Sequence, residues 1–152
     1  GTALRSRVGH SYIKSLMAES GAIFGGEHSG HFYFGDFWRA DSGMLAALYA
    51  LAELMATSKP LSNLLKPYNR YFSSGEINSK VKDAKKSINM IREKYQGSYE
   101  VDELDGLTIS ADTWWFNLRP SNTEPLLRLN VEANTEKEMV KIRDTVLALI
   151  ER

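Results

Sequence analysis

Cysteine is absent from the 152 residues of this chain. Disulfide bonds, thiolate zinc sites and a cysteine nucleophile are therefore excluded. An excess of charge is also absent, because 19 Lys and Arg residues balance 19 Asp and Glu residues. No overall field draws the chain to nucleic acid or to an anionic membrane. We therefore expect neither as a partner, and any bound anion must be held by a local site.

Long apolar runs are missing as well. The longest, residues 44–56, is interrupted by Glu53 and is shorter than the ~20 residues needed to cross a bilayer. The first residues contain no apolar segment typical of a signal peptide, and there is no initiator Met. We expect a cytoplasmic protein whose first residue marks a cut in a longer chain.

The hydrophobic pattern indicates an α+β chain of two segments, joined by a linker at residues 57–60. The first segment, residues 1–58, predicts a sheet hairpin between two helices, the second of them apolar nearly all round and therefore buried. Its expected elements are a helix over 10–20, strands over 22–24 and 31–34 around a glycine-rich loop, and a helix capped by Asp41 or Ser42 that runs to about Ala56.

The second segment, residues 59–152, predicts an antiparallel sheet with helices on one face. The last helix is expected to start at a capping box formed by Thr135 and Glu138. The other expected elements are a short helix over 61–68, an amphipathic helix over 81–95, and strands over 71–77, 98–101, 107–111, 114–118 and 126–133.

The first group of residues with chemical potential is the run Gly26-Glu27-His28-Ser29-Gly30-His31. A carboxylate can accept hydrogen bonds from neighbouring sugar hydroxyls, and a histidine can exchange a proton with one near neutral pH. A glycine turn with solvated polar residues is an equally good interpretation. A metal site of Glu27, His28 and His31 is a third, but the spacing matches no strong metal motif.

The second group is the run Arg119-Pro120-Ser121-Asn122-Thr123-Glu124-Pro125, which lies between two predicted strands. Its guanidinium, hydroxyl, amide and backbone N–H groups are the donors that a phosphate dianion needs. The two prolines stiffen the loop and lower the cost of ordering it. A hairpin loop in which Ser121 and Thr123 bond their own backbone is the alternative.

His10 is a third candidate, at the start of the first predicted helix. The helix dipole disfavours the imidazolium cation there. A neutral imidazole at this place can serve as a hydrogen-bond partner for a ligand, and a structural role is the alternative.

Together, the runs Val8–Lys14, Gly26–His31 and Arg119–Pro125 resemble the α-D-phosphohexomutases, whose sugar-binding and phosphate-binding loops occur in this order. The resemblance implies reversible movement of a phosphoryl group between the 1- and 6-positions of a hexose. It also implies Mg²⁺ and a hexose 1,6-bisphosphate activator and intermediate. Residues 1–58 would be the C-terminal part of the third, mixed α/β sugar-binding domain, and residues 59–152 the fourth, TATA-binding-protein-like domain.

The resemblance also implies a role for each matching residue. Glu27 and Ser29 would contact sugar hydroxyls, and His31 and His10 would lie near the sugar, where one of them assists proton transfer. The phosphate would be bound by four residues of the second loop, namely Arg119, Ser121, Asn122 and Thr123.

The catalytic parts of that family are not found in this sequence, which has neither a Ser-His-Asn-Pro run for the phosphoserine nor an Asp-rich magnesium run. We therefore expect this chain to be inactive by itself. Its expected partners are a hexose phosphate and the missing N-terminal domains, and the open edge of a cut sheet also favours self-association.

Residues 38–51 and 73–79 are most similar to bacterial phosphomannomutases, which favours mannose phosphate as substrate and glucose phosphate as a close second. A fragment of a phosphoglucomutase or of a phosphoglucosamine mutase is an alternative, because His28 occupies the variable position of the sugar loop. A stand-alone sugar-phosphate-binding module without catalysis is another.

Overall fold

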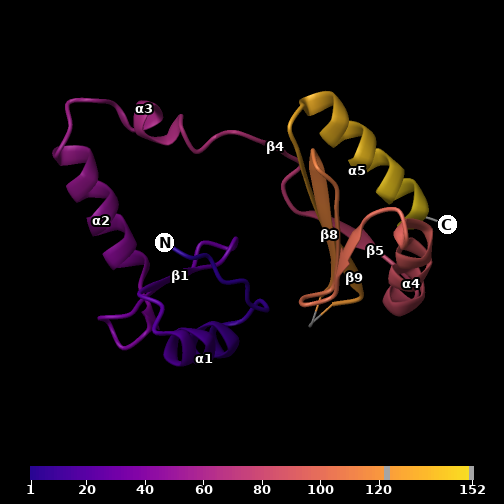
Figure 1. The fold of residues 1–152 in the computed structure, drawn as a ribbon, viewed down its shortest axis with the longest axis horizontal. Helices are drawn as coiled ribbons and strands as arrows, with labels where there is room; N and C mark the ends of the chain where they lie inside the picture. The colour runs from indigo at the N-terminus through magenta and orange to yellow at the C-terminus, as the bar shows by residue number, and fades with distance from the viewer. Residues whose placement is uncertain (122–123, 151–152) are drawn as a thin grey trace. The chain divides into compact units, whose positions relative to one another are not determined.

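The computed structural model describes residues 1–121 and 124–150. The chain divides into two compact units, Gly1–Asn69 and Arg70–Arg152. Figure 1 shows α1 and α2 in the first unit and α4 and α5 in the second. This division lies later in the chain than the linker expected at residues 57–60. The reason is that the short helix α3 (Leu61–Leu65) clusters with the first unit.

The first unit contains a short antiparallel sheet and a helix that packs on it. The helix α1 (His10–Ser20) has the predicted bounds and ends at Gly21, whose φ of 68° is the left-handed conformation that favours glycine. The small core joins Ile13 and Met17 of α1 to Tyr33. The sheet has the order β1 (Phe24–Gly26), β2 (Phe32–Phe34) and β3 (Ala40–Asp41).

Two of these strands lie near their predicted places, and β3 was not predicted. It follows Trp38 and Arg39, which have positive φ values of 52° and 53°. Non-glycine residues seldom adopt this conformation, so nothing in the sequence indicates the turn. The turn brings Asp41 opposite Tyr33 of β2, and this pairing positions one of the site residues described below.

The second helix of this unit, α2 (Gly43–Met55), was predicted correctly in place but not in burial. Ser42 is its cap, because Ser42 Oγ accepts a hydrogen bond from the Leu45 N–H at 3.2 Å. None of the side chains of α2 is buried. Its exposed large apolar residues are Met44, Leu48, Tyr49, Leu51 and Met55. A helix that is apolar on nearly every face needs more cover than this one has in the part of the chain that the structure describes.

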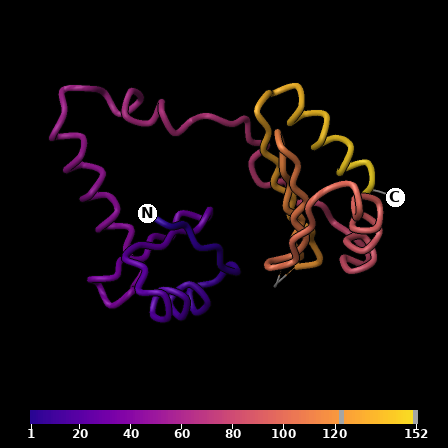
Figure 2. The backbone as a smooth tube through the Cα atoms, in the orientation of Figure 1, coloured from indigo at the N-terminus to yellow at the C-terminus, as the bar shows by residue number. Residues whose placement is uncertain are grey.

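The second unit is built on a six-stranded antiparallel sheet with the order β4-β9-β8-β7-β6, in which β5 also pairs with β9. Figure 2 shows these strands as neighbouring passes of the backbone. Their bounds are β4 (Phe72–Ser73), β5 (Ile77–Lys80), β6 (Glu100–Asp102), β7 (Leu107–Ser110), β8 (Trp114–Pro120) and β9 (Leu126–Ala133).

The single strand expected over residues 71–77 was wrong, since the chain forms two short strands separated by Ser74, Gly75 and Glu76. Gly75 has a φ of 66°, and the Ser74 Oγ accepts from the Val131 N–H at 3.0 Å. The serine therefore satisfies a β9 donor where the ladder is interrupted.

Two helices, α4 (Ala84–Tyr95) and α5 (Glu136–Ile150), cover the same face of this sheet (Figure 1). Asp83 caps α4, because its Oδ1 accepts from the Lys86 N–H at 3.0 Å, so the helix begins later than predicted. Thr135 Oγ1 accepts from the Glu138 N–H at 3.2 Å. The Glu138 carboxylate accepts from Thr113 Oγ1 at 2.8 Å. In a capping box, this carboxylate would accept from the Thr135 N–H instead.

Alternation along the two central strands separates an apolar face from a polar one. The residues of β8 and β9 that face the helices are buried, namely Trp114, Phe116, Leu118, Leu127, Leu129, Val131 and Ala133. Because neighbouring side chains of a strand point to opposite faces, the residues between them lie on the other face. Arg119 and Arg128, which are directly opposite in the register, are at one end of this polar face.

Gly106, in the turn before β7, fits closely against the backbone beside Arg119. A Cβ atom at this position would lie 2.5 Å from the Leu118 carbonyl oxygen and 3.0 Å from Arg119 Cα. Its φ is also positive, at 73°. Only glycine fits such a contact in this conformation, so Gly106 helps to fix the backbone that carries Arg119.

We predict that Leu129→Ala destabilises the second unit by about 2–5 kcal/mol, because it leaves a cavity at a side chain that is 0% exposed. Urea unfolding, followed through the NMR amide signals of β9, measures the loss. The matched control is Leu48→Ala on α2, where the side chain is 55% exposed and the change should stay within about 0.5 kcal/mol. Equal losses in the two variants would contradict the assignment of the core.

We further predict that Gly106→Ala costs more than Gly97→Ala, by roughly 1–3 kcal/mol, and shifts the amide signals of residues 118–119. Both glycines have positive φ, but a Cβ at Gly97 would meet no atom within 4 Å. The difference between the variants therefore isolates the contact with β8 from backbone strain. Unfolding free energies and amide shifts that are the same in both variants would show that this contact is unimportant.

Candidate functional site

The run Gly26–His31 forms the tight connection between β1 and β2. The Glu27 N–H donates to the His31 carbonyl at 2.9 Å, and the Gly30 N–H donates to the Glu27 carbonyl at 3.0 Å. Gly30 has a φ of 86°, which explains the glycine at that place. These bonds close the loop on itself, so Glu27 and His31 lie at its base while His28 and Ser29 are exposed at its tip.

Glu27 is held by a buried tyrosine. The Tyr33 hydroxyl donates a hydrogen bond to Glu27 Oε1, and Tyr33 is only 1% exposed. Burial raises the pKa of Tyr33, and the bond to Glu27 raises this pKa further, so the hydroxyl stays a donor. A carboxylate can accept several hydrogen bonds, so Glu27 can still accept one from a ligand hydroxyl beside this bond.

His31 is paired with Asp41, a residue considered in the sequence only as a helix cap. His31 Nδ1 lies 2.6 Å from Asp41 Oδ2, and Asp41 Oδ1 accepts from the Phe32 N–H at 3.1 Å. The hydrogen bond to Asp41, and then the charge of Asp41, raises the pKa of His31, and Glu27 adds to this effect. The same bond lowers the pKa of Asp41.

A cavity of about 380 Å³ opens beside this loop in the first unit. Its lining includes Arg7, Glu27 and His28 together with apolar residues of α1 and β1. The Arg7 guanidinium lies 4.8 Å from the centroid of the Tyr12 ring. A cation and a carboxylate thus line one cavity beside residues 26–31, although Arg7 was not singled out in the sequence. His10, the exposed first residue of α1, and His31 are not among the residues that line it.

The second loop joins the ends of β8 and β9. The Ser121 N–H donates to the Leu126 carbonyl at 2.8 Å, so this backbone bond closes the hairpin. The Leu126 N–H donates to the Glu124 carbonyl at 2.8 Å. Asn122 and Thr123, which were also expected to bind phosphate, lie outside the described residues.

Arg119 lies in a cluster of opposite charges near this loop. Its side chain is 17% exposed, with nitrogens 3.9 Å from Glu76 Oε2 and 3.7 Å from Asp105 Oδ2. Arg128 Nη1 is 3.5 Å from Glu76 Oε1. The two Arg119 distances exceed those of hydrogen bonds, so the carboxylates attract the guanidinium without occupying its N–H donors. No local sequence pattern indicates this cluster, since its members come from separate strands and turns.

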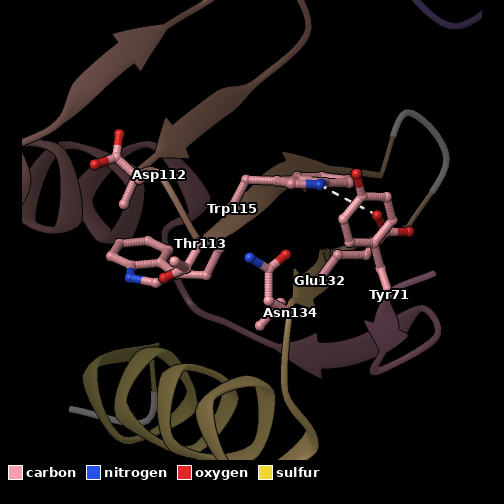
Figure 3. A pocket seen from close by; sticks show the side chains of 9 residues that line it. Tyr71, Asp112, Thr113, Trp115, Glu132 and Asn134 are labelled. Carbon is pink, nitrogen blue, oxygen red and sulfur yellow. Dashed lines mark hydrogen bonds between the residues drawn. The ribbon is translucent and has the colours of Figure 1, made fainter.

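The second unit has a cavity that is unsuited to a sugar phosphate (Figure 3). Its volume is about 270 Å³, and its lining includes Asp112, Trp115 and Glu132, with the Trp115 indole N–H donating to Glu132 Oε2 at 3.2 Å. These residues lie toward the end of β8 and β9 away from the phosphate loop. Because two carboxylates and no cationic residue line this cavity, its field repels an anion.

Among residues 1–121 and 124–150, no group of three His, Asp or Glu side chains is placed to hold a metal ion. Over the same residues, no helix has the length and apolar character needed to cross a membrane.

The comparisons with known proteins agree with the order of the two loops. A family model described as phosphoglucomutase/phosphomannomutase, alpha/beta/alpha domain III, matches residues 1–71. A second model, for the C-terminal domain of the same family, matches residues 76–149. The two models together take in both loops.

Individual relatives match over almost the whole chain. A phosphomannomutase of Methanocaldococcus jannaschii is 47% identical over 99% of this chain and 33% of its own length. A phosphomannomutase of Escherichia coli is 39% identical over 99% of this chain and 34% of its own length. The chain thus spans about a third of the length of these curated relatives.

A solved structure shows the same fold. The crystal structure of a phosphoglucomutase/phosphomannomutase family protein from Burkholderia thailandensis superposes with a TM-score of 0.77 at 30% identity, over 96% of this chain and 31% of that one. This confirms the predicted α+β class, with antiparallel sheets packed against helices. The chain therefore belongs to the phosphoglucomutase/phosphomannomutase family, of which it represents the third and C-terminal domains.

Proposed function

We propose that this chain is the substrate-recognition part of a phosphohexomutase, which interconverts hexose 6-phosphate and hexose 1-phosphate. The observation that carries the proposal is that each loop presents a ligand-binding group held by the fold. Glu27 is held by the buried Tyr33 hydroxyl, and Arg119 by Glu76 and Asp105. Groups fixed in advance lower the cost of ordering on binding, which favours both affinity and orientation.

In this proposal the first loop recognises the sugar. Glu27 Oε2 accepts a hydrogen bond from one hydroxyl, and Ser29 contacts another from the loop tip. A carboxylate is an acceptor only, so it suits hydroxyls and repels a phosphate, which keeps the charged end of the substrate away from this loop. His31 or His10 exchanges a proton with the reacting hydroxyl.

The second loop holds the phosphate that is not being transferred. Arg119 supplies charged donors, and Ser121, Asn122 and Thr123 supply the remaining ones. A phosphate dianion placed near Arg119 competes with the carboxylates of Glu76 and Asp105 for the guanidinium. Its advantage is the close, paired hydrogen bonding that a planar guanidinium makes with phosphate, whereas the two carboxylates are 3.9 Å and 3.7 Å away.

The chemical step would depend on domains beyond this chain. We place the phosphoserine there, with the Mg²⁺ that the family resemblance implies and the hexose 1,6-bisphosphate intermediate. The described residues supply no magnesium site. The same domains would cover the exposed apolar side chains of α2. Domain limits of 1–58 and 59–152, and a cytoplasmic location, belong to this proposal as well.

Mannose phosphate is the substrate that we favour, with glucose phosphate second. The relatives from M. jannaschii and E. coli are both named phosphomannomutase. Glucosamine phosphate is less consistent with His28 in the sugar loop. Competition between the three hexose phosphates in the full-length protein would rank them directly.

We predict that Arg119→Ala in the full-length protein lowers affinity for a hexose 1-phosphate by roughly 10–100-fold. This corresponds to the loss of a charge-assisted hydrogen bond worth about 1.5–3 kcal/mol. Calorimetric titration and the KM of the mutase reaction measure the effect. Arg143→Ala, which removes an arginine of α5 paired with Asp144, is the matched control and should leave both values unchanged. Kinetics of Arg119→Ala equal to those of the control would refute the role of this loop.

We also predict that the chain alone has no mutase activity, with or without Mg²⁺ and a hexose 1,6-bisphosphate. The reason is that the sequence contains no Ser-His-Asn-Pro run that would hold the phosphoserine nucleophile. A coupled assay on protein shown by mass spectrometry to be free of host mutase checks this. Turnover by such a sample would favour a catalytic centre within these 152 residues.

A further inference from the structure

Asp41 is held in place on both of its carboxylate oxygens. Oδ1 accepts from the Phe32 N–H at 3.1 Å, and Oδ2 lies 2.6 Å from His31 Nδ1. The first bond connects the carboxylate to the backbone of β2, where Tyr33 pairs with Asp41 across the sheet. The carboxylate is therefore anchored, and the imidazole of His31 is oriented by it.

This geometry decides which nitrogen of His31 carries a proton when the ring is neutral. An ionised carboxylate can only accept hydrogen bonds, so the nitrogen that faces Asp41 must be the donor. That nitrogen is Nδ1. The lone pair of the neutral ring is then on Nε2, the nitrogen that Asp41 does not contact.

We propose that Asp41 is the positioning residue for His31, which it holds in the Nδ1–H tautomer so that Nε2 accepts a proton from a sugar hydroxyl. The second half of this statement rests on the proposed function, and the first half does not. When the hydroxyl oxygen takes a phosphoryl group from the phosphoserine of the parent protein, a new P–O bond forms as the P–O bond to the serine breaks. The O–H bond of the hydroxyl breaks and its proton binds to Nε2, while the serine oxygen takes a proton from a general acid of the domains that carry it. The reverse transfer returns the proton from Nε2.

Charges around His31 set the pH range of this arrangement. Asp41 on β3 and Glu27 at the base of the loop both raise the pKa of His31 above its ordinary value of 6.5, and the Tyr33 hydroxyl nearby is neutral. The pKa of Asp41 is lowered from 3.8. Between the pKa of Asp41 and the pKa of His31, the carboxylate is ionised and the imidazole is protonated, so both carry their charges. The stabilisation from this ion pair is lost as pH falls through the pKa of Asp41 or rises through the pKa of His31. Both side chains are exposed to water, which keeps its contribution to folding small.

The first test measures the tautomer of His31 in this chain without any ligand. ¹⁵N signals of labelled histidine, recorded above the pKa of His31, distinguish Nδ1–H from Nε2–H. We expect Nδ1–H in the unaltered chain. A neutral ring protonated on Nε2 would overturn the proposal, and this result needs no variant, so misfolding cannot obscure it.

The variant Asp41→Asn should change the tautomer. Its amide oxygen can still accept from the Phe32 N–H, and its NH₂ group then donates to Nδ1, which moves the ring proton to Nε2. The pKa of His31 should also fall toward its ordinary value. Asp36→Asn is the matched control, because this exposed carboxylate lies in the same β2–β3 connection and removes the same charge without a bond to His31. Identical tautomers in Asp41→Asn and the control would overturn the proposal.

The second test uses the full-length protein. Asp41→Asn should lower kcat by at least roughly tenfold, within the 10²–10⁴-fold that general acid–base catalysis contributes, with little change in KM. The pH limb assigned to His31 should move to lower pH, an effect that a merely structural defect would not produce. Unchanged kcat in an active protein would overturn the catalytic half of the proposal. Absence of mutase activity in the unaltered full-length protein would instead refute the proposed function, and the tautomer would still decide the role of Asp41.

Discussion

The pairing of β8 with β9, from Trp114 opposite Ala133 to Pro120 opposite Leu127, is the constraint on which the second unit depends. One face of this pair supplies a large share of the buried core, and the other carries Arg119 and Arg128. A slip of one residue would exchange the two faces. The apolar residues that stabilise the fold therefore also determine where the loop between β8 and β9 begins and on which side Arg119 lies.

The first unit uses a single buried residue in a similar way. Tyr33 packs in the small core with Ile13 and Met17, and its hydroxyl reaches Glu27. Its neighbours in the sheet complete the arrangement, because Asp41 is opposite Tyr33 and bonds to His31. Burial, strand pairing and two carboxylate contacts thus organise a short loop that would be mobile in isolation.

Much of this architecture could be predicted from the sequence, because it depends on local patterns. The bounds of α1 and β9 follow from periodicity and alternation, and the cap of α2 is Ser42, one of the two residues expected there. What could not be predicted depends on contacts between distant residues. Asp41 reaches His31 only after a turn at Trp38 and Arg39 with unusual backbone angles, and Glu76 and Asp105 reach Arg119 only through the sheet. The burial expected for α2 was wrong. The apolar composition of the helix indicates that it needs a packing surface, but composition does not show where that surface lies.

A crystal structure of the full-length protein with a hexose phosphate tests most directly whether Glu27 binds a sugar hydroxyl and whether Arg119 binds phosphate. We predict Glu27 Oε2 within hydrogen-bond distance of a sugar hydroxyl, at about 2.6–3.2 Å, and a phosphate in contact with the Arg119 guanidinium. A hexose phosphate whose sugar and phosphate bind elsewhere, with Glu27 and Arg119 retaining only the partners described above, would contradict it.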